Sequence, residues 1–161
     1  MANDSNVMDE LKKLLGSVTP PGVNEVEKGA IRRYAEAVGD PNPLYSDMEY
    51  ARSSKYRGII SPPGFFGWPT KVSTGAMEMM APIFEALFKA GLFRILDGGV
   101  EYDFYLPVRA GDILTWYARF ADAKEKMGKT GEKMVFITME ITYMNQNGDL
   151  VAKRRQTFIA R

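Results

Sequence analysis

The chain has 161 residues, of which 45% are hydrophobic and 25% are charged, and these fractions are ordinary for a globular domain. A formal net charge of +1 argues against a nucleic-acid-binding surface, and the lack of cysteine excludes disulfides and thiolate metal sites. The chain also has no histidine, so any mechanism that needs an imidazole must take it from another chain.

The N-terminal part of the sequence predicts helices and one short strand. Residues 1–16 contain a leading helix, because apolar side chains recur on one face of residues 6–15, and this helix either packs on the core or acts as a lid. The same segment lacks the apolar run of a signal peptide. No other run is long enough to cross a membrane, so we expect a cytoplasmic protein without a membrane span. Residues 23–26 predict a strand, and residues 27–38 predict an amphipathic helix.

That amphipathic helix ends in a rigid corner over residues 39–47. Gly39 can take the left-handed conformation that closes a helix, and the two prolines of residues 40–43 restrict their own backbone and that of their predecessors. Residues 46–49 have the pattern of a capping box for a second helix over residues 47–54. The corner presents three polar side chains, Asp40, Asn42 and Tyr45.

The corner resembles the hydratase motif of the MaoC-like (R)-specific enoyl-CoA hydratases and dehydratases. That motif is an aromatic residue, Gly-Asp-x-Asn-Pro, an aliphatic residue, His, any residue and Asp, followed shortly by Ala. The matching residues are Tyr34, Gly39, Asp40, Asn42, Pro43, Leu44, Asp47 and Ala51. Tyr45 stands where this family has its catalytic histidine. Residues 58–63 and 106–114 look like the FAS1-like dehydratase branch, as in the mycobacterial HadA and HadC subunits, and the resemblance covers residues 17–160.

This resemblance implies an α+β hot-dog fold, in which an antiparallel sheet wraps around a central helix. It also implies that residues 59–66 open that helix, so that its first amides face the thioester carbonyl. Since Pro62 and Pro63 carry no N–H, Gly64 or Phe65 would have to donate. The implied catalytic pair, degenerate at its second position, is Asp40 and Tyr45. The implied substrate-binding residues are Asn42, Ser61, Gly64 and Phe65.

Simpler interpretations of the same residues stay open. Asp40 can satisfy turn amides after the helix-ending glycine, and Tyr45 can pack the corner as a half-buried aromatic. A tyrosine with the ordinary pKa of about 10 is neutral near pH 7 and is a poor proton acceptor. Beyond the corner, Arg52, Lys55 and Arg57 form either a solvated surface or a contact for the phosphates of coenzyme A or a carrier-protein pantetheine.

Residues 67–91 predict a broken helical region, with the central helix near its start and a second helix over residues 82–90. An apolar stripe in this region either belongs to the core or lines a flexible acyl pocket. Its members are Met79, Met80, Ile83, Phe84, Leu87 and Phe88.

From Gly98 onward the hydrophobic pattern alternates. It predicts long antiparallel strands over residues 100–106, 114–123, 135–143 and 151–159. Asn147-Gly148 predicts the last hairpin turn, and residues 128–130 form an exposed hairpin loop. Lys153-Arg154-Arg155 lies within the last strand and is too short for a nucleic-acid patch.

Three functions are consistent with this pattern. The first is a subunit of a heteromeric (R)-specific enoyl-thioester hydratase or dehydratase, which binds the acyl group for a histidine-bearing MaoC-like partner. The second is a self-sufficient hydro-lyase that uses Asp40 and Tyr45, and the third is a non-catalytic acyl-CoA-binding module. The missing imidazole favours the first. We expect an acyl-CoA or acyl-carrier thioester and a MaoC-like hot-dog chain, which can be a second copy, as partners, with no cofactor, metal or nucleic acid.

Overall fold

The computed structural model describes residues 6–71 and 75–161, and within this part the helices precede the long strands. The elements follow in the order α1 (Val7–Leu14), β1 (Gly22–Glu25), α2 (Lys28–Val38), the short 3-10 helix η1 (Pro43–Tyr45), α3 (Met48–Ser53), β2 (Trp68–Lys71), α4 (Gly75–Lys89), β3 (Ile95–Phe104), β4 (Ile113–Met127), β5 (Lys133–Met144) and β6 (Leu150–Ala160).

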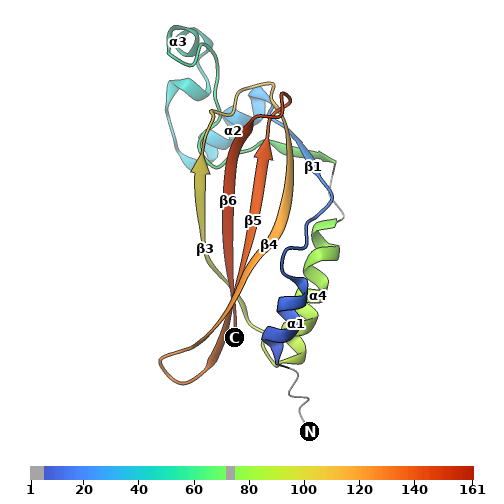
Figure 1. Cartoon of the computed structure of the whole chain (residues 1–161). Helices are drawn as coiled ribbons and strands as arrows, with labels where there is room; N and C mark the ends of the chain where they lie inside the picture. The colour runs from blue at the N-terminus through green and yellow to red at the C-terminus, as the bar shows by residue number, and fades with distance from the viewer. Residues whose placement is uncertain (1–5, 72–74) are drawn as a thin grey trace.

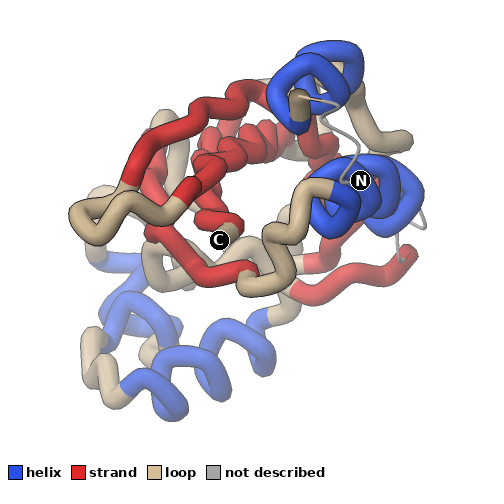
Figure 2. Tube along the Cα trace, turned by 90° about the horizontal axis from the view of Figure 1, so that it is seen from below, coloured by secondary structure: helices blue, strands red, loops and turns tan. Residues whose placement is uncertain are grey.

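The strands form one sheet in the order β2-β1-β4-β5-β6-β3, and every neighbouring pair is antiparallel. Figure 1 shows the four long strands side by side, with the β4–β5 hairpin at one end and α2 and α3 at the other. The view from below shows that these strands bend into a strongly curved sheet (Figure 2). Within the described chain, β3 pairs only with β6, so its other side is an open edge.

The curved sheet packs its inner face on α4 and α1. We call inner the face that carries Val135, Ile137 and Met139 of β5, which are buried in one cluster with the two helices. The contributions of the helices to that cluster are Val7 and Leu11 from α1 and Met79, Ile83, Ala86 and Leu87 from α4. The fold is therefore a hot-dog fold, with α1 lying beside the central helix α4 (Figure 1).

Local sequence explains where the predicted helices begin and end. The Asn6 side chain accepts a hydrogen bond from the Met8 amide and caps α1, which confirms the predicted leading helix. Gly39 closes α2 with a φ of 71°, as its glycine character predicts. The predicted hairpin at Asn147-Gly148 is confirmed, and Gly148 takes a φ of 81° there.

The prediction for residues 67–91 is wrong in its first half. Trp68–Lys71 forms strand β2, which pairs with β1, instead of the central helix. A proline is tolerated in this strand because β2 lies at the edge of the sheet. The central helix is α4, a single helix that contains Pro82 in its interior and does not begin there.

The predicted strands are present, and all four are longer than the alternating pattern indicates, β3 and β4 most clearly. β3 begins at Ile95, and β4 continues to Met127. Residues 128–130 form the exposed connection between β4 and β5, as predicted. None of the helices in the described ranges combines the length and the apolar character that crossing a membrane requires.

Candidate functional site

The corner after α2 is held by its own polar side chains. Asp40 Oδ1 accepts a hydrogen bond from the Asn42 amide at 3.1 Å, and Asn42 Oδ1 accepts one from the Leu44 amide at 3.1 Å. These are two successive turns in which an acidic or amide side chain closes on the backbone two residues later. The structural interpretation of Asp40 is thus supported by a direct contact, and Asp40 itself is exposed.

The start of α3 differs from the predicted capping box. Asp47, not Ser46, is the N-cap, and its Oδ1 accepts from the amides of Glu49 and Tyr50 at 2.9 and 3.0 Å. Ser46 instead ends the short helix η1, and its amide donates to the Pro43 carbonyl. Asn42 caps η1 and Ser46 ends it. Because Ser46 belongs to the end of η1, the cap of the next helix, α3, is Asp47.

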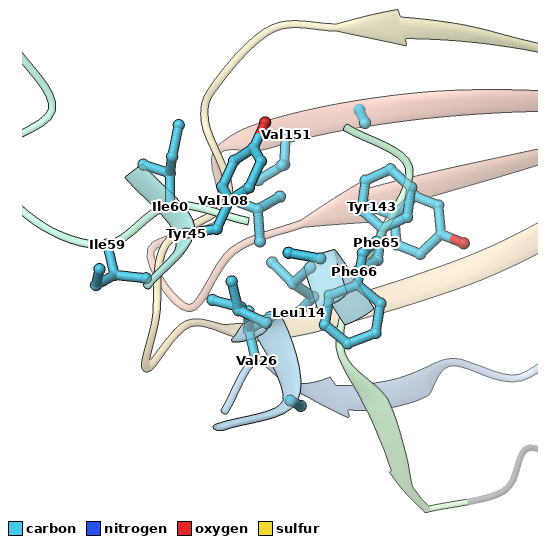
Figure 3. Packing of buried hydrophobic residues seen from close by; sticks show 14 of the residues in the cluster. Val26, Tyr45, Ile59, Ile60, Phe65, Phe66, Val108, Leu114, Tyr143 and Val151 are labelled. Atoms are coloured by element: carbon cyan, nitrogen blue, oxygen red, sulfur yellow. The ribbon is translucent and has the colours of Figure 1, made fainter. Parts of the chain in front are cut away.

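A cavity of about 380 Å³ lies next to this corner. Its walls come from the corner, from residues 56–66 and from the segment that leaves β3. The lining residues are Asn42, Leu44, Tyr45, Tyr56, Ile60, Ser61, Pro62, Pro63, Gly64, Phe65, Phe66, Phe104, Tyr105, Leu106, Pro107 and Val108. Figure 3 shows Tyr45 beside Val108 and Ile60 in the buried cluster at this end of the sheet. The structure thus brings five of the predicted site residues together: Asn42, Tyr45, Ser61, Gly64 and Phe65.

Tyr45 is the buried polar residue of the corner. Its side chain is 6% exposed, and burial raises the pKa of its hydroxyl. The neighbouring Asp40 carboxylate raises this pKa further, while a hydrogen bond with the Asn42 side chain opposes the change. Tyr45 therefore stays neutral near pH 7, where it can donate a hydrogen bond but is a poor base.

The segment over residues 61–65 forms a turn and does not open a helix, so this expectation is wrong. The Phe65 amide donates to the Pro62 carbonyl at 3.1 Å, and the Ser61 hydroxyl donates to the Phe65 carbonyl at 2.7 Å. The chain then enters β2, which explains why α4 begins only at Gly75. The amides of Gly64 and Phe65 are the two expected to face a thioester. Of these, the Phe65 amide is already bonded, whereas the Gly64 amide makes no hydrogen bond to the described residues.

An aromatic wall extends the cavity along the inner face of the sheet. The ring of Phe66 stacks on that of Tyr143 with centroids 4.1 Å apart, and its centroid lies 6.0 Å from that of Tyr102 and 6.4 Å from that of Phe104. The sequence interpretation missed this wall. Its only signal was the alternation of the strands, which does not tell which strands are neighbours.

The predicted basic cluster lies outside the cavity. Arg52, Lys55 and Arg57 are all exposed, and none of them lines the cavity. Lys55 Nζ lies 5.1 Å from the ring centroid of Tyr56, whose carbonyl accepts a hydrogen bond from Arg109 Nη1. The solvated-surface interpretation thus agrees with the exposure of the cluster, while Tyr56 is the residue of this segment that reaches the cavity.

The apolar stripe of α4 lies in the core except at its end, where Phe88 is 43% exposed. Ile83 and Leu87 are fully buried against α1 and the inner face, and no stripe residue lines the cavity. In the part of the chain that the structure describes, no group of three or more acidic side chains is placed to bind a metal ion.

Comparisons with known proteins agree with this architecture. Residues 13–154 match the family model described as "FAS1-like, dehydratase domain region". A Streptomyces avermitilis protein named "UPF0336 protein" is 34% identical over 112 residues, which cover 70% of this chain and 71% of that protein. A Thermomonospora curvata protein named "Probable enoyl-CoA hydratase alpha subunit" is 28% identical over 145 residues, which cover 83% of this chain and 44% of that protein.

Among solved structures, a chain of the ChsH1-ChsH2 complex from Mycobacterium tuberculosis superposes with a TM-score of 0.83 at 21% sequence identity, covering 98% of this chain and 92% of the other. At this identity the likeness establishes the hot-dog fold. The family model extends from the end of α1 into β6, so it includes the corner, the cavity and nearly all of the sheet. The chain therefore belongs to the FAS1-like dehydratase-domain family of MaoC-like hot-dog proteins.

Proposed function

We propose that this chain is a subunit of an (R)-specific 2-enoyl-thioester hydratase or 3-hydroxyacyl dehydratase, and that it binds the acyl group for a histidine-bearing MaoC-like partner. One observation carries the proposal. The described residues that line the cavity are apolar, aromatic or neutral polar, and none of them accepts a proton readily near pH 7. The site can hold an acyl thioester, but it lacks the base that hydration requires.

The mechanism of hydration shows why a missing base slows the reaction. In hydration a base takes a proton from water, the hydroxyl oxygen bonds to C3 of the enoyl group, and an acid delivers a proton to C2. Donors must also stabilise the thioester oxygen, for which the free Gly64 amide is suited. Tyr45, in the motif position of the histidine, supplies a donor only. Losing a positioned acid or base typically costs about a hundredfold to ten-thousandfold in rate, so we expect the isolated chain to be slow.

The open edge of the sheet supports a partner chain. β3 exposes its unpaired side along Ile95–Phe104, and its inner-face side chains Val100 and Phe104 are 44% and 49% exposed. Exposed apolar strand edges are normally covered by another strand or chain. A relative named as an alpha subunit and a solved neighbour that is a two-protein complex agree with such an assembly.

The carrier of the acyl group would extend out of the cavity. We further propose that the phosphates of this carrier, which is coenzyme A or the pantetheine of a carrier protein, contact the exposed basic residues at and beyond the end of α3. These residues are Arg52, Lys55 and Arg57. A cytoplasmic location, where such thioesters are available, stays a prediction.

Activity of the chain alone and with a partner tests the proposal. The chain is co-expressed with a MaoC-like protein of the same organism that carries the Asp-x-Asn-Pro-x-His motif, and hydration of a 2-enoyl-CoA is followed by ultraviolet absorbance. We expect the isolated chain to bind the thioester and hydrate it very slowly, and the complex to be active. A robust rate from the isolated chain would instead support a self-sufficient hydro-lyase that uses Asp40 and Tyr45. Binding without activity in any complex would support an acyl-CoA-binding module.

A further inference from the structure

Two adjacent arginines of β6 lie on opposite faces of the sheet. Arg155 is opposite Glu140 and Glu101, and it forms ion pairs with Glu101 and Asp103 at 3.3 and 2.8 Å. Arg154 is opposite Ile141 and Tyr102, on the same inner face as the aromatic wall. The charge of Arg155, on the outer face, is paired with two surface carboxylates, whereas Arg154 lies on the face that packs on apolar side chains.

Arg154 has no carboxylate partner among the described residues. One guanidinium nitrogen, Nη2, donates to Gln156 Oε1, and Gln156 Nε2 in turn donates to Asp97 Oδ1 at 2.6 Å. The guanidinium also donates a hydrogen bond to the Tyr143 hydroxyl. The Nε atom of Arg154 is buried without any hydrogen-bond acceptor in the described chain. Arg154 is half-buried, and its other donors have partners, but an N–H group that is buried without an acceptor opposes folding, so this nitrogen does not stabilise the sheet.

Arg154 does not line the cavity, but Tyr102 lies between the cavity residue Gly64 and the Arg154 guanidinium. A Cβ placed on Gly64, which lines the cavity, would lie 3.9 Å from the Tyr102 hydroxyl. The guanidinium carbon of Arg154 lies 6.0 Å from the centroid of the Tyr102 ring. Along the inner face, Arg154 is one step beyond the position where Phe104 of the cavity wall pairs with Ala152. An acyl group that extends from the cavity over Phe104 and Tyr102 therefore reaches this guanidinium.

The surroundings define what the guanidinium can recognise. The rings of Phe66, Tyr102 and Phe104 form an apolar surface that suits the hydrocarbon part of an acyl group, and an alkyl end would leave the Arg154 Nε donor unsatisfied. We infer that Arg154 is a specificity-determining residue for acyl groups that carry an acceptor oxygen, a carboxylate above a ketone, on the part remote from the thioester. This inference rests on the proposed acyl-binding function. A carboxylate suits the site best, because a guanidinium binds it through two parallel hydrogen bonds.

Binding of saturated thioesters tests the inference without any need for turnover. Affinities are measured by calorimetry for alkanoyl-CoA and ω-carboxyalkanoyl-CoA pairs of matched length, over a series of lengths, with the full chain and with its complex. We expect the carboxylate-ended ligand of the fitting length to bind about tenfold or more tightly than its methyl-ended match. Arg154→Met should remove this preference, and Arg154→Lys should keep part of it.

Arg155→Met is the matched control, since it removes a neighbouring cation from the outer face and should keep the preference. Equal affinities for both ligands at every length would overturn the inference while leaving the proposed function intact, as long as both ligands bind. The same loss of preference in both arginine variants would also overturn it, because it would show a nonspecific effect of charge. Failure of all thioesters to bind would overturn the proposed function and this inference with it.

Discussion

The carboxylate of Asp40 accepts a hydrogen bond from the Asn42 amide at 3.1 Å, so the acidic residue of the corner closes a turn. An asparagine can accept the same bond, whereas an alanine cannot. We expect Asp40→Asn to keep the melting temperature of the parent chain and Asp40→Ala to lower it, as measured by calorimetry. Equal melting temperatures for both variants would contradict the turn-closing role.

Replacing Tyr45 by histidine should create a base in the corner. We expect Tyr45→His to raise the hydration rate of the isolated chain, because Asp40 lies close enough to influence the Tyr45 hydroxyl and can orient an imidazole. The new activity should increase as the pH rises through about 6.5, where an ordinary imidazole loses its proton. Tyr45→Phe is the control, since it keeps the packing without a base. A rate that does not exceed that of this control would contradict the prediction.

Buried tyrosines should make the fold sensitive to alkali. Burial raises the pKa of the Tyr143 hydroxyl, and the Arg154 guanidinium partly opposes this change. Because the folded-state pKa lies above the unfolded value of about 10, the folded state holds the proton more tightly. The stabilisation is fully present below about pH 10 and is lost as the pH rises through the folded-state pKa.

We therefore expect the free energy of unfolding in urea to fall above about pH 10, and Tyr143→Phe to make that fall smaller. Tyr50→Phe, which removes the hydroxyl of a residue that is 51% exposed, is the matched control. Identical slopes in the parent and in Tyr143→Phe would show that this prediction is wrong.

The core and the cavity should respond differently to truncation. Ile83 is fully buried in the core cluster, so Ile83→Ala should lower the free energy of unfolding by about 2–5 kcal/mol. Phe104 is 49% exposed and lines the cavity, so Phe104→Ala should cost less stability and should weaken acyl-CoA binding. Urea unfolding and calorimetric binding measure the two effects. Unchanged acyl-CoA affinity in Phe104→Ala would show that the Phe104 side chain does not contribute to acyl binding.

The parts of the fold that local chemistry determines could be predicted from the sequence. The leading helix follows from the apolar face of α1, and the end of α2 follows from Gly39. The Asn147-Gly148 turn and the alternation of β5 identify the last hairpin. One of the wrong predictions concerns β2, where Pro69 looks like a helix interruption but lies in a short edge strand that pairs with β1.

The remaining features depend on which strands become neighbours. The wall of Phe66, Tyr102 and Tyr143 exists because β6 lies between β3 and β5, and no local pattern states that order. The same strand pairing places Arg154 and Arg155 on opposite faces of the sheet, although both belong to one run of three basic residues in the sequence. The corner residues of the site could be predicted because they are consecutive, and the inner-face residues could not because they come from distant strands.

In the proposed complex, a partner chain supplies the catalytic groups. The most direct test is the hydration rate of the mixed complex in which this chain carries Asp40→Asn, beside a complex in which the motif aspartate of the partner carries the same change. We expect a loss of at most a few-fold for Asp40→Asn, because the asparagine can still close the turn, and a loss of about a hundredfold or more for the partner change. A loss of about a hundredfold or more in the Asp40→Asn complex would instead place the chemistry on this chain.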